Sequence, residues 1–145
     1  MFLLQAMCSL SVLPSPSVMR YWDALNPHQR AIGGDPYVGA KLGHSLHAAG
    51  FRAGDLVHNT FSYHFTPAGF MTDGAARRIG CAVFPAGVGQ TEMQVQAIAE
   101  LKPAGYIGTP SFLKIILEKA DELKADVSSL KKAVVSGEAF FPNQK

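Results

Sequence analysis

The sequence has few cysteines, few charged residues and no cluster of like charges, and each shortage excludes a class of protein. The two cysteines, Cys8 and Cys81, lie far apart without a paired motif, so neither a disulfide framework nor a zinc site is indicated. Charged residues make up 17% of the chain and the formal net charge is +2, with no basic patch of the kind that binds nucleic acid. A reducing, cytoplasmic location is the default expectation.

Targeting and membrane signals are also sparse. Residues 1–12 are apolar, but they lack a basic flank and a small-residue cleavage site and are too short to span a bilayer. Pro14 and Pro16 then break any regular element. We therefore expect no membrane association, and we expect residues 1–34 to form an irregular lead-in to one domain at residues 35–145.

Apolar residues, by contrast, are abundant enough for a folded core. They make up 48% of the 145 residues, which suits one soluble domain and argues against disorder. Short apolar runs alternate with segments of helical spacing at intervals of about 25 residues, which is the rhythm of βαβ units. The fold class predicted is therefore α/β, with a mostly parallel sheet and flanking helices. The expected strands are residues 56–61, 81–84, 104–108 and 132–135.

The helices are expected between these strands, each with its own start or stop signal. Asp35 and Pro36 begin the first, whose stripe of Val38, Leu42, Leu46 and Ala49 ends at Gly50. A second is predicted at residues 68–79. Thr91 and Gln94 form a capping box that begins a third, which Pro103 stops. The fourth follows Pro110, with Phe112, Ile115, Ile116 and Leu123 facing inward.

In a parallel sheet the loops that follow the strands share one edge. Those loops comprise residues 63–66, 87–91, 109–111 and 136–139, and we expect them to line a crevice where helix N-termini favour anions. No nucleophile elbow of the Gly-x-Ser-x-Gly type and no phosphate loop of the Gly-x-x-x-x-Gly-Lys-Ser/Thr type occurs, so hydrolase chemistry is not favoured.

Individual polar residues leave alternatives open. His64 could orient a carboxylate or polarise an acyl group, or it could bond to the backbone of its own loop. His58 lies in the middle of a strand and is expected to be a packed core residue. Glu138 could serve the site or cap the following turn. His44 and His47 could share a helix face and bind metal, but without a further ligand nearby we favour a solvated helix.

Taken together, the loop sequences resemble one known family. Its motifs are VHNTFSY at residues 57–63, Gly69, GCAV at 80–83, GQTEMQVQ at 89–96, TPS at 109–111 and SGEA at 136–139. In this order and spacing, over roughly residues 45–142, they resemble the phenylacetate–coenzyme A ligase group of the adenylate-forming, or AMP-binding, superfamily.

The resemblance implies a function and a set of site residues. Enzymes of this family activate a carboxylic acid with ATP and Mg²⁺ to an acyl-adenylate and then transfer the acyl group to coenzyme A. It implies that the aryl or acyl pocket is bordered by Tyr63, His64, Phe65, Gly69, Gly87 and Gly89. It implies that AMP is held by Ser136, Gly137, Glu138 and Ala139. His64 departs from the family, where glycine is common at that place.

Other family features are missing from the sequence. Nothing in residues 1–34 matches the Ser/Thr/Gly-rich phosphate loop, and the chain ends at Lys145, before the ribose-binding aspartate and the C-terminal domain with the catalytic lysine. We therefore expect a partial AMP-binding domain that is inactive alone, with an oligomer or the remainder of the enzyme as partner. The alternative is a non-catalytic α/β module that binds a nucleotide or another small molecule.

Overall fold

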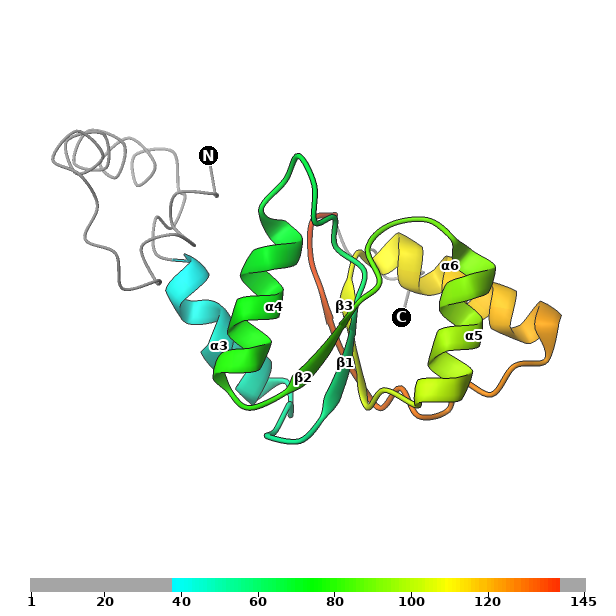
Figure 1. The fold of residues 1–145 in the computed structure, drawn as a ribbon, viewed down its shortest axis with the longest axis horizontal. Helices are drawn as coiled ribbons and strands as arrows, with labels where there is room; N and C mark the ends of the chain where they lie inside the picture. Colours follow the sequence, from blue (N-terminus) through cyan, green and yellow to red (C-terminus); the bar gives the residue numbers. More distant parts are fainter. Residues whose placement is uncertain (1–37, 139–145) are drawn as a thin grey trace, which may run out of the picture.

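The computed structural model describes residues 38–138, in which helices and strands alternate along the chain (Figure 1). The elements, in order, are α3 (Val38–Ala48), β1 (Leu56–Asn59), α4 (Ala68–Arg78), β2 (Ala82–Pro85), α5 (Thr91–Leu101), β3 (Gly105–Gly108), α6 (Pro110–Leu123) and β4 (Lys132–Val135). The lead-in, the predicted helix start at Asp35, Cys8 and Ala139 lie outside the described residues.

The four described strands form one parallel sheet in the order β2-β1-β3-β4. Helices α3 and α4 pack on one face, and α5 and α6 on the other (Figure 1). Each connection from strand to strand passes through a helix, as parallel pairing requires. The predicted α/β class is confirmed.

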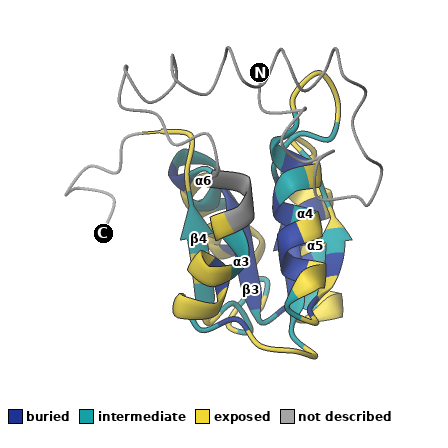
Figure 2. Ribbon diagram, turned by 90° about the vertical axis from the view of Figure 1, so that its left-hand side faces the viewer, coloured by how far each residue is buried: buried dark blue, intermediate teal, exposed yellow. Residues whose placement is uncertain are grey.

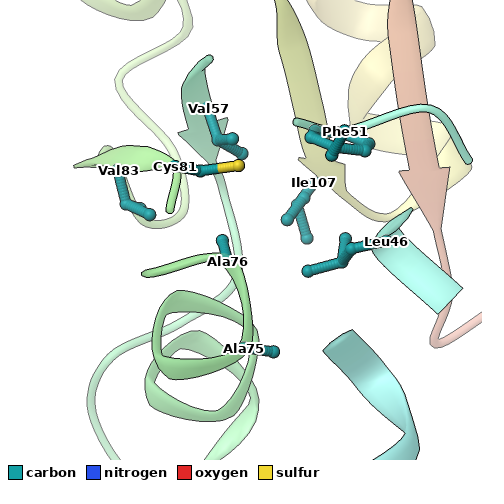
Figure 3. Close-up of a cluster of buried hydrophobic side chains, with 8 residues drawn as sticks. All are labelled: Leu46, Phe51, Val57, Ala75, Ala76, Cys81, Val83 and Ile107. Atoms are coloured by element: carbon teal, nitrogen blue, oxygen red, sulfur yellow. The ribbon is translucent and has the colours of Figure 1, made fainter. Parts of the chain in front are cut away.

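The core beneath α3 and α4 is a cluster of small and aliphatic side chains with Phe51 at one side (Figure 3). Its buried members are Leu46, Phe51, Val57, Ala75, Ala76, Cys81, Val83 and Ile107. Phe51 lies against Gly105 of β3, where a Cβ atom would be 2.3 Å from the phenyl ring. Gly105 therefore makes room for the largest side chain of this core.

Burial raises the pKa of the Cys81 thiol, which favours an unreactive structural cysteine.

The second core lies beneath α5 and α6. It contains Val95, Ile98, Tyr106, Ile116 and Ala120, and β3 is buried along its whole length (Figure 2). Phe112 packs against this cluster, as predicted. The inward placement of Ile115 and Leu123 is wrong, because they are 46% and 44% exposed. Ile115 lies about 100° around the helix from Ile116. Leu123 is the last residue of α6.

Element boundaries follow local backbone chemistry. Gly50 and Gly80 adopt φ values of +92° and +88° after α3 and α4, as expected of glycine at helix ends. Strand β1 ends at Asn59, two residues before its predicted end at Phe61. The reason is that the Asn59 side chain accepts a hydrogen bond from the Phe61 amide at 3.2 Å, which turns the chain. No helix among the described residues is long and apolar enough to cross a membrane.

Candidate functional site

The candidate site is the edge of the sheet where the four parallel strands end. The loops after β1 and β2 extend above the sheet at this edge (Figure 1, top). The loops after β3 and β4 leave the same edge because all four described strands run in one direction. The predicted gathering of the four loops is therefore present, and buried polar side chains of β1 and α5 hold the loops after β1, β2 and β3 in place.

Asn59 holds the loop of residues 61–69. Its side chain is fully buried, and its amide nitrogen lies 2.8 Å from Tyr63 Oη, 2.9 Å from Thr72 Oγ1 and 3.1 Å from the Gly69 carbonyl. Gly69 is required at its position, because a Cβ atom there would be 2.5 Å from the Ser62 carbonyl oxygen. The two ends of the loop are thus joined through one carboxamide.

The hydroxyl of Tyr63 belongs to the same network. It accepts from Asn59 and donates to Asp73 at 3.2 Å, and Asp73 pairs with Arg77 one turn further along α4. Burial, followed by the negative charge of Asp73, raises the pKa of Tyr63 far above its usual range. Tyr63 is therefore a neutral, half-buried anchor whose hydroxyl is turned toward α4.

His64 and Phe65 form the exposed tip of this loop. Phe65 is 101% exposed and adopts a φ of +58°, and its ring meets the His64 ring edge-on at 5.6 Å. The His64 amide bonds within the loop to Ser62 Oγ at 3.3 Å, and its carbonyl accepts from the same hydroxyl. These bonds use the His64 backbone, so its imidazole remains exposed to solvent at the tip.

Gln94 holds the loop of residues 86–90. Its side-chain nitrogen donates to the Gly87 and Gly89 carbonyls at 3.0 and 2.7 Å. The predicted capping box of Thr91 and Gln94 is wrong: α5 begins after the left-handed Gln90 without a side-chain cap. The Gln94 side chain is instead 4% exposed and turned into the protein.

The remaining Gln94 bond joins this loop to the central strand β1. Because the Gln94 nitrogen donates to two carbonyls, its oxygen must accept the third bond, from His58 Nε2 at 2.8 Å. His58 is therefore the tautomer protonated at Nε2, and its buried Nδ1 lacks a partner among the described residues. Burial lowers the pKa of His58, an effect that Gln94 partly opposes. The prediction that His58 is a packed core residue is consistent with its 1% exposure.

The loop after β3 is held in the same manner, and an exposed contact joins it to the loop after β4. Thr60 Oγ1 donates to Tyr106 Oη at 2.8 Å, and Tyr106 Oη donates to the Thr109 carbonyl at 3.2 Å. Glu138 accepts from the Ser111 amide at 3.2 Å and from the Ser111 hydroxyl, which lowers the pKa of Glu138. Glu138 thus caps the start of α6 rather than the turn that follows it, and its part in a ligand site stays a prediction.

The sequence did not reveal that residues behind the loops hold them in place. His58, Asn59 and Thr60 are three consecutive polar residues at the end of a central strand, all at most 3% exposed. Buried polar groups need partners, so this run was the available signal.

Neither His44 nor His47 is buried, and no group of three or more His, Cys, Asp or Glu side chains within residues 38–138 could hold a metal ion.

Comparison with known proteins gives a consistent family likeness. No family model matches the chain. The chain is 35% identical over 98 residues to the phenylacetate-coenzyme A ligase of Aromatoleum evansii, covering 66% of this chain and 22% of that protein. It is 41% identical over 80 residues to the enzyme of the same name from Pseudomonas putida, covering 55% and 18%.

Solved structures extend this likeness to the fold. A 2-hydroxyisobutyryl-CoA ligase in complex with 2-HIB-AMP and CoA matches 72% of this chain and 25% of its own, with a TM-score of 0.62 and 26% identity. The same ligase in its postadenylation state gives a TM-score of 0.63 and 28% identity over 69% of this chain. The resemblance to phenylacetate–coenzyme A ligases is thus confirmed, and the chain spans about a fifth of the length of these curated relatives.

Proposed function

We propose that this chain forms part of the substrate-binding face of an acid–coenzyme A ligase. Such an enzyme activates an aryl or other carboxylic acid with ATP to an acyl-adenylate, releases pyrophosphate, and transfers the acyl group to coenzyme A. The observation that carries the proposal is the joint likeness in sequence and fold to ligases of this type. Four loops at one sheet edge suit the proposal, because open α/β sheets bind ligands there.

The acid is assigned to the loops after β1 and β2. His64 and Phe65 offer an exposed imidazole and phenyl ring, and the open space beside Gly87 and Gly89 lets a ligand approach the backbone closely. Gly69 would shape the same pocket from behind, because its missing Cβ makes room for the Ser62 carbonyl. A neutral Tyr63 anchors the first loop through its hydroxyl, so its ring edge rather than its oxygen would face the acid. These groups would bind and orient the substrate, while the reacting atoms are its carboxylate and the ATP phosphate.

The nucleotide is assigned to the loop after β4, at Ser136, Gly137 and Glu138, with Ala139 outside the described residues. The first three are exposed, and Gly137 adopts a φ of +88°. Glu138 already occupies the first turn of α6, so we assign no phosphate to that helix terminus. Mg²⁺ would arrive with ATP, bound mainly by its phosphate oxygens.

A ligand titration followed by NMR tests the proposal. Because the chain spans about a fifth of the related ligases, the experiment measures binding rather than turnover. The ¹⁵N-labelled chain is titrated separately with phenylacetate and AMP. We expect phenylacetate to shift the amides of residues 61–69 and 86–90, and AMP to shift those of residues 136–138.

The controls remove one chemical feature from each ligand. 2-Phenylethanol lacks the carboxylate and adenosine lacks the phosphate, so each should shift the same amides less. Shifts that spread evenly, or that gather at the opposite edge of the sheet, would contradict the proposal. Binding of AMP without any acid would instead favour the non-catalytic nucleotide-binding module.

A further inference from the structure

Gln94 and His58 form a buried link between the central strand and the glycine loop of residues 86–90. The link runs from the imidazole of β1 through the Gln94 carboxamide of α5 to the Gly87 and Gly89 carbonyls. Every polar hydrogen of the Gln94 side chain is used in it. The imidazole is itself held in place, because it stacks on Phe84 with ring centroids 5.4 Å apart. The loop is thus linked through Gln94 of α5 to a packed imidazole of the sheet.

The glycine loop has little stiffness of its own. Gly87 and Gly89 have no side chains and adopt φ values of +70° and +76°, and a Cβ atom at either would meet nothing within 4 Å. Glycine also has more conformational freedom to lose than any other residue. One further bond joins the loop to β1, from the Gly87 amide to the Asn59 carbonyl at 3.1 Å. The position of the glycine loop therefore depends largely on the Gln94 side chain.

We propose that Gln94 and His58 are positioning residues that set which acid the crevice accepts. This inference rests on the proposed function, in which the glycine loop forms one wall of the acid pocket. Neither side chain needs to touch the acid: at 4% and 1% exposure they act from behind the loop. Releasing the Gly87 and Gly89 carbonyls lets the wall move, so discrimination between a bulky aryl acid and a small branched acid weakens.

Two variants and a matched control separate this role from general stability. Gln94→Glu keeps the shape and the acceptor for His58 but cannot donate to the two carbonyls. The double variant His58→Phe with Gln94→Met replaces both partners by apolar groups of similar size, an exchange that often costs little stability. Gln96→Glu makes the same chemical change at an exposed position of α5.

The first readout needs no ligand. We expect hydrogen exchange at the Gly87 amide to become about tenfold faster in Gln94→Glu and in the double variant, as for the loss of one or two hydrogen bonds. Gln96→Glu should leave this rate unchanged, and the double variant should keep an unfolding midpoint near that of the unaltered chain. NMR of the imidazole nitrogens should show His58 protonated at Nε2 in the unaltered chain.

The second readout is the ratio of affinities for phenylacetate and 2-hydroxyisobutyrate. We expect this ratio to move at least threefold toward unity in the double variant and to stay constant in Gln96→Glu. A folded double variant with an unchanged ratio overturns the inference and leaves the proposed function standing. If the unaltered chain binds neither acid, the proposed function fails and the inference fails with it.

Discussion

Replacing Asn59 by leucine tests whether the loop of residues 61–69 is held from inside the sheet. Leucine has the same number and branching of side-chain heavy atoms and is apolar, so the change removes hydrogen bonds without leaving a large cavity. The Asn59 amide has two hydrogens and three acceptors within 3.1 Å, and its oxygen accepts from Phe61. Asn59→Leu therefore removes two donated hydrogen bonds and one accepted hydrogen bond.

At about 1 kcal/mol for each bond, the expected loss is about 3 kcal/mol of unfolding free energy. That is a large fraction of the roughly 5–15 kcal/mol that holds a typical domain folded. With a urea m-value of about 2 kcal/mol/M, the unfolding midpoint should fall by about 1.5 M. Circular dichroism during urea titration measures both quantities.

A control and a double-mutant cycle make the result specific to this network. Thr66→Val makes a polar-to-apolar change at an exposed position of the same loop and should cost less than about 0.5 kcal/mol. Combining Asn59→Leu with Tyr63→Phe should give a coupling energy of about 1 kcal/mol, because the two side chains share a bond of 2.8 Å. A loss below about 1 kcal/mol for Asn59→Leu, or no coupling, would refute the assignment of Asn59 as the anchor.

Three further changes probe other contacts of the site. Gly69→Ala places a Cβ atom 2.5 Å from the Ser62 carbonyl oxygen, so we expect a loss of about 1–3 kcal/mol by urea titration, with amide shifts concentrated in the loop. Burial raises the pKa of Tyr106 to about 12, so its contribution to stability is present below its usual pKa of 10 and is lost as pH rises toward 12. In Tyr106→Phe the thermal unfolding midpoint should therefore fall less between pH 10 and pH 12 than in the unaltered chain. Burial lowers the pKa of His58 from 6.5, so its contribution to stability is present above pH 6.5 and is lost as pH falls. In His58→Phe the thermal unfolding midpoint should therefore fall less steeply below pH 6.5. The same steepness in the variant and the unaltered chain would contradict a buried neutral imidazole.

The sheet could be predicted from the sequence because its signal is local. Short apolar runs separated by helical segments give the four described strands, and the predicted strand at residues 132–135 matches β4 at both ends. Predictions of boundaries and helix faces failed where side chains intervene. Asn59 ends β1 early by bonding to the Phe61 amide, and the buried face of α6 centres on Ile116 and Ala120 instead of Ile115.

The supports of the site could not be predicted, because they join residues distant in sequence. Thr91 followed by Gln94 has the pattern of a capping box, and that pattern is complete within four residues. The partner that Gln94 takes instead, His58, is 36 positions away. Local and long-range partners compete for the same carboxamide, and only the folded sheet brings the imidazole within reach.

The side of the sheet that each supporting residue reaches follows from the two-residue period of a β-strand. Successive side chains point to opposite faces, so His58 and Thr60 reach the α5 and α6 side while Asn59 reaches the α4 side. Three adjacent residues can therefore hold the loops after β1, β2 and β3, which one face alone could not do. Burying polar groups in a central strand is costly unless they are bonded. Apart from His58 Nδ1, these side chains bond to the loops directly or through one further side chain. The side chains of His64 and Phe65, at the exposed tip, take no part in these buried bonds, so they are free to suit a ligand.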